Sequence, residues 1–306
     1  MANRVINFHD VYNKNWFEQT LLILKRKYTI ISIRELDDFF YKGKTLQNTC
    51  LITVDDGDKT FYEVMYPVLL KLQLPAILFV SPKIITNKEN FWFQEIRHFD
   101  KIRLNKIIFD YYHTDLQAYT NGSILKNCSI HDIWEIIRTY KEQTNDQETK
   151  TYNMSLEQLK EVHQSKIVTI GAHTQNHPIL KNEVAEKSKT EIQDSIDALE
   201  TLLQDKIYYF AYPNGTPDVD YTQREMSFLK EKGIRLAFST KSDNFSLNYN
   251  PLEVPRFGLS YGSANFVKIK LFLGKYWDLI KNIKSPDEQS LRKEIRAKMQ
   301  NSTKQN

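Results

Sequence analysis

The feature that most constrains the fold of this sequence is a series of short apolar runs separated by longer amphipathic segments. Runs such as Ala76–Val80 are almost entirely apolar, which is typical of strands buried on both faces of a parallel sheet. The runs are Arg4–His9, Thr29–Ile33, Cys50–Val54, Ala76–Val80, Ile167–Ile170, Ile207–Ala211, Arg235–Ser239 and Leu252–Phe257. Segments with helical periodicity lie between them, namely Trp16–Lys27, Thr60–Leu72 and Val184–Gln204. The alternation predicts an α/β fold, either a barrel or a doubly wound sheet.

Two stretches interrupt this alternation. Residues from about 86 to 165 contain no convincing strand and are expected to form a helical insertion between two core strands. We therefore expect a core domain over residues 1–262, followed over residues 263–306 by a basic amphipathic helix and a flexible tail. The apolar positions of that helix are Ile269, Leu271, Phe272, Leu273, Tyr276, Trp277, Leu279, Ile280 and Ile283. The helix either docks on the core or binds a membrane surface or a partner.

Composition excludes several other classes of protein. The net charge of +4 is too evenly mixed to indicate nucleic-acid binding. The two cysteines, Cys50 and Cys128, lie far apart and are expected to be buried free thiols. No apolar run approaches the ~20 residues of a transmembrane helix, and the first residues do not resemble a signal peptide. We expect a cytoplasmic protein, with the basic C-terminal helix as a means of peripheral contact with the inner face of the membrane.

The first candidate site follows an apolar run directly, at Asp55 and Asp56. On its own, Asp-Asp-Gly is usually a turn that caps the next helix. The functional interpretation is that one carboxylate binds a metal ion and its neighbour acts as a base. Consecutive strand residues point to opposite sides. Gly57 would let the backbone bend so that both carboxylates reach one site.

The second candidate site is His173-Thr174-Gln175-Asn176-His177, which also follows an apolar run. Histidines four residues apart lie on one face of a helical turn and can share a metal ion, although most such pairs are structural or solvated. Two imidazoles and one carboxylate form an open zinc site, with a position left for water or substrate.

A third motif, Tyr212-Pro213-Asn214-Gly215, is either an ordinary turn or a rigid turn whose backbone N–H faces the site as an oxyanion donor. His9 and Arg256, taken singly, have ordinary structural interpretations. Their joint position is more informative. In a parallel α/β barrel the carboxyl ends of all strands meet at one face, where active sites are built. His9, both aspartates, both histidines and this turn all follow predicted strands.

The motifs resemble those of the polysaccharide deacetylase family, carbohydrate esterase family 4. Thr53-Val54-Asp55-Asp56-Gly57 is similar to its T-F-D-D-G motif, and His173–His177 to its H-[ST]-x-x-H motif. The resemblance covers roughly residues 4–260. It implies a distorted (β/α) barrel of about seven parallel strands and one divalent metal ion, zinc above all. Asp56, His173 and His177 would hold that ion, with Asp55 as the general base.

The sequence departs from the family at two motifs. The R-x-P-Y-G motif reads Ala211-Tyr212-Pro213-Asn214-Gly215, and no histidine follows His177. A permuted branch, similar to the poly-N-acetylglucosamine deacetylases, carries its catalytic histidine near the N-terminus and has an F-A-Y-P-x-G motif. By that resemblance His9 is the general acid. Arg256 is expected to orient Asp55 in place of the missing arginine, and the N–H near Tyr212–Asn214 to stabilise the oxyanion.

The function implied is metal-dependent removal of N-acetyl groups from an N-acetylated sugar or glycan precursor. Trp92, Phe91, Phe93 and Tyr212 are candidates for stacking on the sugar, although such residues are more often core. The expected location favours a lipid-linked or nucleotide-linked substrate. Two alternatives stay open: hydrolysis of another amide C–N bond, and a catalytically inactive carbohydrate-binding barrel. The sequence makes no prediction of oligomeric state.

Overall fold

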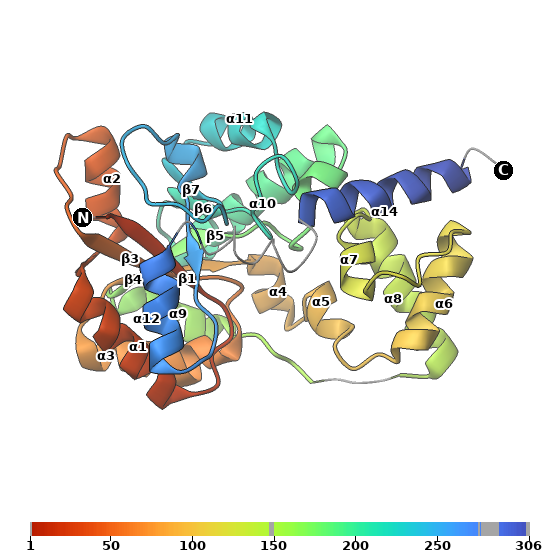
Figure 1. Ribbon diagram of the computed structural model, residues 1–306, viewed down its shortest axis with the longest axis horizontal. Helices are drawn as coiled ribbons and strands as arrows, with labels where there is room; N and C mark the ends of the chain where they lie inside the picture. Colours follow the sequence, from red (N-terminus) through yellow and green to blue (C-terminus); the bar gives the residue numbers. More distant parts are fainter. Residues whose placement is uncertain (1, 147–149, 275, 277–287, 304–306) are drawn as a thin grey trace.

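The computed structural model describes residues 2–146, 150–274, 276 and 288–303, and its centre is a parallel sheet (Figure 1). Neighbouring strands follow the order β7-β6-β5-β4-β3-β1-β8, and β2 pairs with β3 off this path. The strands are β1 (Arg4–Phe8), β2 (Thr29–Ile31), β3 (Thr49–Val54), β4 (Ala76–Val80), β5 (Val168–Ala172), β6 (Tyr209–Ala211), β7 (Leu236–Phe238) and β8 (Phe257–Gly258). Every pairing between them is parallel, as the unbroken apolar runs predict.

The segment Val254–Gly258 joins the two ends of this sheet. Val254 pairs with Phe238 at the end of β7, and its N–H donates to the carbonyl of Ala237. Three residues later, Phe257 pairs with Ile6 of β1. The sheet is thereby curled into a distorted (β/α) barrel, and the predicted fold class is confirmed.

Two apolar cores lie on the two faces of the strands. The inner core contains Val5, Leu51, Phe79 and Phe238, and α2 (Ile33–Tyr41) adds Leu36 to it. The outer core lies under the surrounding helices, because successive strand residues point to opposite faces. Those helices are α1 (Lys14–Lys27), η1 (Phe61–Met65), α3 (Tyr66–Leu72), α9 (Leu156–Gln164), α10 (Ala185–Leu203), α11 (Gln223–Glu231) and α12 (Ala264–Leu273). Short 3₁₀ turns are η2 (Leu180–Asn182) and η3 (Pro251–Glu253).

The helical insertion between β4 and β5 has a core of its own, which includes Leu104, Ile133 and Ile137. Its helices are α5 (Trp92–Glu95), α6 (Lys101–Tyr112), α7 (Asn121–Leu125) and α8 (Ile130–Thr144). Helix α4 (Pro82–Asn87), which precedes them, packs against α10 and buries Ile85 in the outer core. Figure 1 shows α6, α7 and α8 grouped to one side of the barrel. The predicted insertion ran to about residue 165, but α9 buries Leu159 and Val162 in the barrel's outer core. Helix α9 is therefore a barrel helix.

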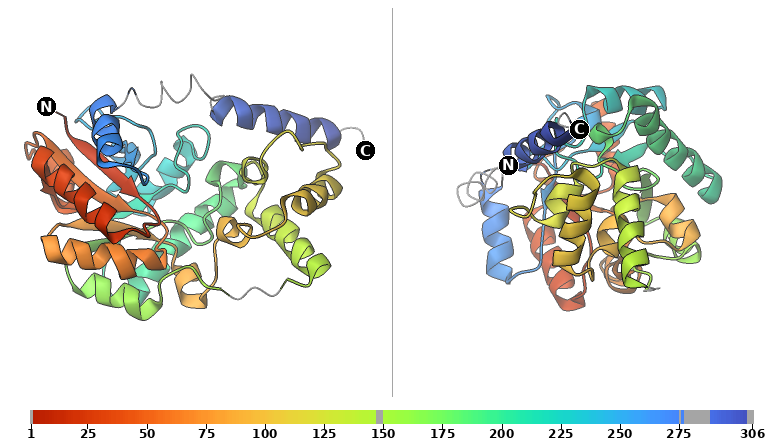
Figure 2. Two further views of the ribbon diagram at one scale, coloured as in Figure 1. Left: turned by 60° about the horizontal axis from the view of Figure 1, so that its bottom comes forward. Right: turned by 90° about the vertical axis from the view of Figure 1, so that its right-hand side faces the viewer.

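The C-terminal region differs in part from the expectation. Helix α12 buries Val267 and Leu271 in the outer core, as a docked helix would. The predicted apolar positions Trp277, Leu279, Ile280 and Ile283 lie outside the described residues. Instead of a mobile tail, residues 288–303 form α14 (Glu288–Thr303), because Ile295 enters the insertion's core (Figure 2). Among the described residues, no helix is long and apolar enough to cross a membrane.

Candidate functional site

Several strand ends deliver polar side chains to one pocket at the carboxyl edge of the sheet. His9 follows β1, both aspartates follow β3, and His173 follows β5. Asn214 follows β6 by three residues. The pocket has a volume of about 260 Å³ and is lined by His9, Asp55, Asp56, Trp92, Phe93, Lys126, His173, His177, Asn214 and Thr240. The geometry thus brings together six of the residues predicted from strand ends, with Trp92 from α5 beside them.

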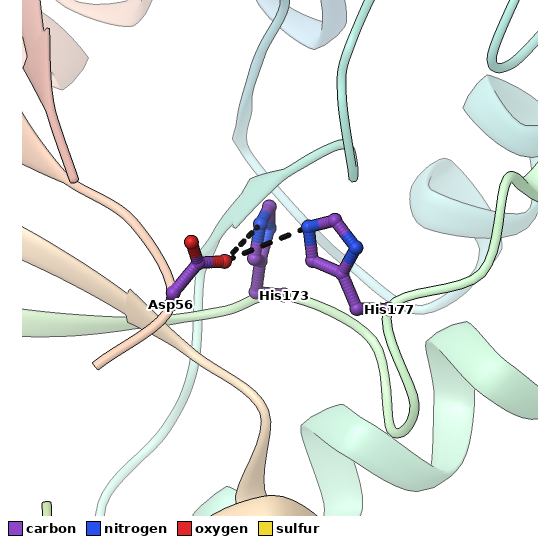
Figure 3. Close-up of side chains that lie close together, drawn as sticks. All are labelled: Asp56, His173 and His177. Atoms are coloured by element: carbon purple, nitrogen blue, oxygen red, sulfur yellow. Dashed lines mark ion pairs between the residues drawn. The ribbon is translucent and has the colours of Figure 1, made fainter. Parts of the chain in front are cut away.

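Asp56, His173 and His177 form a cluster that fits a divalent cation. The Oδ1 atom of Asp56 lies 3.5 Å from the Nε2 atoms of both histidines (Figure 3). One donor atom from each residue lies within 4.8 Å of the others. Asp56 Oδ1 is buried and accepts no hydrogen bond among the described residues, which is costly unless a cation satisfies it. One carboxylate and two imidazoles suit a zinc-type ion and leave coordination positions open.

A tight turn after β3 aims two consecutive carboxylates into the same pocket. The Gly57 N–H donates to the carbonyl of Asp55 at 3.0 Å, and both Asp56 (φ +74°) and Gly57 (φ +77°) are left-handed. A Cβ at Gly57 would also lie only 3.0 Å from Cγ1 of Val80. Glycine meets both demands, of which the sequence predicted the first, the bend of the backbone.

The expectation that His173 and His177 share one face of a helical turn is wrong. Residues 173–178 form a loop, in which Thr174 (φ +64°) and His177 (φ +54°) have left-handed backbones that no α-helix contains. The Thr174 hydroxyl accepts a hydrogen bond from the His177 N–H at 3.1 Å and closes the loop. The two rings still meet, with centroids 4.8 Å apart.

A hydrogen bond orients His173 for a metal ion, and burial keeps His177 neutral. His173 Nδ1 lies 2.7 Å from the Ala211 carbonyl, which can only accept, so Nδ1 carries a proton and Nε2 is the atom whose lone pair can face a metal ion. Burial would lower the pKa of His173, but Asp56 and then Asp55 raise it overall. Burial lowers the pKa of His177 to about 3, so this ring stays neutral. Burial would raise the pKa of Asp56, but the adjacent rings of His173 and then His177, whose Nε2 atoms lie 3.5 Å from Oδ1, hold it far below its usual range.

Asp55 lies in a separate buried network. Arg256 Nη1 donates to Oδ1 at 2.7 Å and Asn7 Nδ2 donates to Oδ2 at 3.0 Å. Burial would raise the pKa of Asp55, but the Arg256 guanidinium, followed by His173 and His9, lowers it overall. Asn7 also accepts from Thr53 Oγ1 at 2.8 Å. The sequence analysis gave Asn7 and Thr53 no role of their own, although polar residues within otherwise apolar runs were an available signal.

Arg256 lies where the sequence analysis placed it, in the segment that closes the barrel. Its side chain is almost completely buried, and Nε donates to the Ser239 carbonyl at 3.0 Å. His9 lies at the rim instead, with its side chain 53% exposed and its Nε2 atom 3.8 Å from Asp55 Oδ2. Asp55 therefore has a fixed cation on its inner side and a solvated imidazole on its outer side.

The turn after β6 leaves one backbone donor available. The Tyr212 N–H donates to the Phe238 carbonyl at 3.2 Å, and Pro213 has no N–H. The Asn214 N–H donates no hydrogen bond within the described part of the chain. Asn214 is itself left-handed (φ +55°), and its carbonyl accepts from Thr240 Oγ1 at 2.7 Å.

The aromatic candidates divide into two groups. Trp92 lines the pocket and donates its indole N–H to the His177 carbonyl at 3.2 Å. The centroid of the Phe93 ring lies 5.0 Å from the centroid of the His177 ring. Tyr212 does not line the pocket, because its ring stacks on Tyr221 in the outer core and its hydroxyl donates to the Leu252 carbonyl. Lys126 and Thr240 line the pocket and carried no signal in the sequence.

Comparisons with known proteins agree with this geometry. A family model described as "Polysaccharide deacetylase" matches residues 42–237. No curated protein matches the sequence. The solved structure of the deacetylase PplD of Streptococcus pyogenes, in complex with acetate, is 17% identical over 88% of this chain and 97% of that chain, with a TM-score of 0.60. IcaB from Ammonifex degensii is 18% identical over 90% of this chain and 97% of that chain, with a TM-score of 0.61.

A third similar structure is the BpsB deacetylase domain from Bordetella bronchiseptica. It is 15% identical over 84% of this chain and 96% of that chain, with a TM-score of 0.55. At such identities these three structures share a fold with this chain. The match of the family model covers both aspartates and both histidines of the cluster, while His9 and Arg256 lie outside it.

Proposed function

This chain belongs to the polysaccharide deacetylase family, whose members are metal-dependent carbohydrate de-N-acetylases, and from that premise we propose how its own residues remove an acetyl group. The substrate is an N-acetylated sugar or glycan precursor. The observation that carries the proposal is the separation of two buried carboxylates. Asp56 faces two imidazoles at 3.5 Å, whereas Asp55 is held by Arg256 at 2.7 Å. One carboxylate is thus equipped to bind a cation and the other to accept a proton.

Asp56 Oδ1 and the Nε2 atoms of both histidines would hold the ion, which is zinc in this proposal. When bound, a divalent cation polarises the acetyl carbonyl and makes water a stronger acid. Asp55 is ionised at neutral pH, since its pKa is lowered, and its Oδ2 atom accepts the proton of the attacking water. Arg256 and Asn7 fix the carboxylate in place for that transfer.

The remaining steps use the pocket rim. The Asn214 N–H stabilises the negative charge that develops on the acetyl oxygen. His9, in its protonated form, donates from Nε2 to the sugar nitrogen as the carbon–nitrogen bond breaks, and acetate leaves. Trp92 and Phe93 form the wall of the pocket next to His177. Their rings suit the apolar face of a sugar ring and the acetyl methyl group. The products are acetate and a free amine.

The decisive experiment measures metal content and acetate release together. Purified wild type is compared with His173→Ala and with His163→Ala, a matched control in which the removed histidine lies on α9, outside the pocket. We expect about one equivalent of zinc in wild type and in the control, and a loss of both metal and acetate release in His173→Ala. A wild type that binds no divalent metal, or that binds it and releases no acetate from any N-acetylated sugar, would overturn the proposal.

A further inference from the structure

The side-chain amide of Asn214 has a buried donor that no described residue satisfies. Its Nδ2 atom is closed off from solvent and has no acceptor among the described residues. Buried polar atoms are almost always hydrogen-bonded, because an unpaired one destabilises the folded protein. Asn214 lines the pocket of about 260 Å³ described above, the reaction pocket. The missing acceptor is therefore expected from a ligand in that pocket.

The turn that carries Asn214 is fixed from both sides. The Asn214 carbonyl accepts from Thr240 Oγ1 at 2.7 Å, and the Gly215 carbonyl accepts from the Thr240 N–H at 2.8 Å. The turn is also tight, since a Cβ at Gly215 would lie 3.0 Å from the Tyr212 carbonyl oxygen. These contacts hold the backbone that carries the amide before any ligand binds. A donor held in advance is what stabilises developing charge most effectively.

The same segment contacts the candidate metal cluster. Three residues before Asn214, the Ala211 carbonyl oxygen lies 2.7 Å from Nδ1 of His173. The two pocket carboxylates are engaged with other groups, since Asp55 pairs with a guanidinium and Asp56 faces two imidazoles. A substrate group that reaches the cluster therefore enters the cavity that Asn214 lines, and it brings the acceptor that the cavity lacks.

Burial indicates which part of the substrate supplies that acceptor. The three residues of the cluster are each at most 7% exposed, whereas the His9 side chain at the rim is 53% exposed. The Nδ2 atom of Asn214 is buried like the cluster, so it suits the group that enters deepest. In the proposed reaction that group is the acetyl group. Its oxygen gains negative charge when water adds to the acetyl carbon, so a donor at this place gains most in the transition state.

We propose that the side chain of Asn214 is a catalytic residue, whose Nδ2 donates a hydrogen bond to the acetyl oxygen as negative charge develops there. It is a second donor beside the backbone N–H of the same residue. The inference rests on the proposed function and adds a residue to its chemistry. When water adds to the acetyl carbon, the electron pair of the carbonyl double bond moves to the oxygen. It returns when the carbon–nitrogen bond breaks.

The amide donor is a feature of this chain. The R-x-P-Y-G motif has tyrosine at the position of Asn214, and the F-A-Y-P-x-G motif has no fixed residue there. The backbone of Asn214 is left-handed (φ +55°), a conformation that glycine adopts at the lowest cost. Asparagine fits this backbone less well than glycine but brings a donor with it, which is consistent with a task for the side chain.

The kinetic test compares Asn214→Gly with wild type, on an N-acetylated sugar that wild type deacetylates. This variant removes only the side chain, because glycine keeps the backbone N–H and tolerates the left-handed backbone. We expect kcat to fall about 10²- to 10³-fold with little change in KM, as for the loss of one preorganised donor. Asn214→Asp, which has the same shape but no N–H donor, should lose at least as much. Asn145→Gly is the matched control, since Asn145 is also left-handed (φ +52°) and ends α8 outside the pocket.

A stability measurement separates this role from a structural one. Asn214→Gly removes a buried donor without a partner, so its midpoint of chemical denaturation should match or exceed that of wild type. Zinc content should also stay at the wild-type level, because Asn214 is outside the cluster. A lower midpoint with unchanged kcat would show that the side chain only supports the turn, and would refute the inference.

A binding measurement separates the inference from the proposed function. The probe is a methylphosphonamidate analogue of N-acetylglucosamine, whose charged tetrahedral group resembles the state after water has added. Calorimetry on zinc-loaded protein should show about 100-fold weaker binding of this analogue to Asn214→Gly, with the Kd for N-acetylglucosamine little changed. That result supports the donor even if wild type releases no acetate. Unchanged kcat and unchanged analogue binding, in an active wild type, would refute the inference and leave the proposed function intact. A wild type that binds the analogue no better than the sugar would refute it as well.

Discussion

Asp55 and Asp56 are adjacent in sequence, yet each has its own electrostatic partner. A buried carboxylate is costly unless a charge or several hydrogen bonds compensate it. Asp55 is compensated by Arg256 and Asn7 within the protein, whereas Oδ1 of Asp56 accepts no hydrogen bond from the described residues. This difference gives the two residues different tasks, and each task can be removed separately by mutation.

Asp55→Asn tests the proton-accepting task. The amide has the shape of the carboxylate but accepts no proton, so we expect kcat to fall about 10²- to 10⁴-fold. Zinc content should stay near wild type, because Asp55 is not among the three residues that we propose to hold the ion. Steady-state acetate release and metal analysis on the same preparation measure both. Unchanged turnover would remove Asp55 from the role of base.

Arg256→Met tests the inner partner of Asp55. The variant leaves a buried carboxylate without its cation, and breaking such a pair typically costs about 3–5 kcal/mol of unfolding free energy. Chemical denaturation measures this loss, and the double variant Arg256→Met/Asp55→Asn should recover part of it, since the stranded charge is gone. Arg235→Met is the control, because its ion pair with Asp37 is more exposed and should contribute less. An equal loss in both single variants would show that Arg256 does not compensate Asp55 in particular.

At the scale of elements, the strands could be predicted from sequence and several connections could not. The run Ala76–Val80 matches β4 residue for residue, because burial on both faces leaves a continuous apolar signal. The loop from His173 to His177 was mistaken for a helical turn, since left-handed backbones at residues other than glycine leave no mark in composition. The direction of the Tyr212 ring was missed for a related reason, because its stacking partner Tyr221 lies on a separate connection.

Gly171→Ala tests how closely the end of β5 must pack to place His173. A Cβ there would lie 2.5 Å from the Phe79 ring and 3.0 Å from the Tyr209 carbonyl, so the strand end or the ring must shift. We expect a loss of about 1–3 kcal/mol in unfolding free energy, as for other overpacked sites, together with weaker zinc binding. Gly258→Ala, also in a strand, meets nothing within 4 Å and is the control. Equal stability and zinc affinity in both variants would contradict this account of β5.

At the scale of the whole molecule, α14 connects the insertion to the barrel. Arg292 bridges the two parts, because it pairs with buried Asp220 of the barrel and donates to the carbonyl of Lys126 at the end of α7. Asn182 of η2 donates to the same carbonyl at 3.0 Å and accepts from Arg296 at 2.6 Å. Lys126 lines the reaction pocket, so these contacts fix one wall of the site from the far end of the chain.

Arg292→Met should therefore loosen the insertion without unfolding the barrel. Removing one partner of a buried ion pair typically costs ~3 kcal/mol or more, which corresponds to amide exchange about 100-fold faster where that contact limits opening. We expect this acceleration in residues 121–130, with exchange in β3 and β4 unchanged, and a higher KM for substrate with kcat less affected. Lys293→Met, an exposed neighbour on the same helix, is the control. If exchange in residues 121–130 stayed at the wild-type rate, the insertion's own core would suffice to hold this wall, and α14 would have no part in shaping the site.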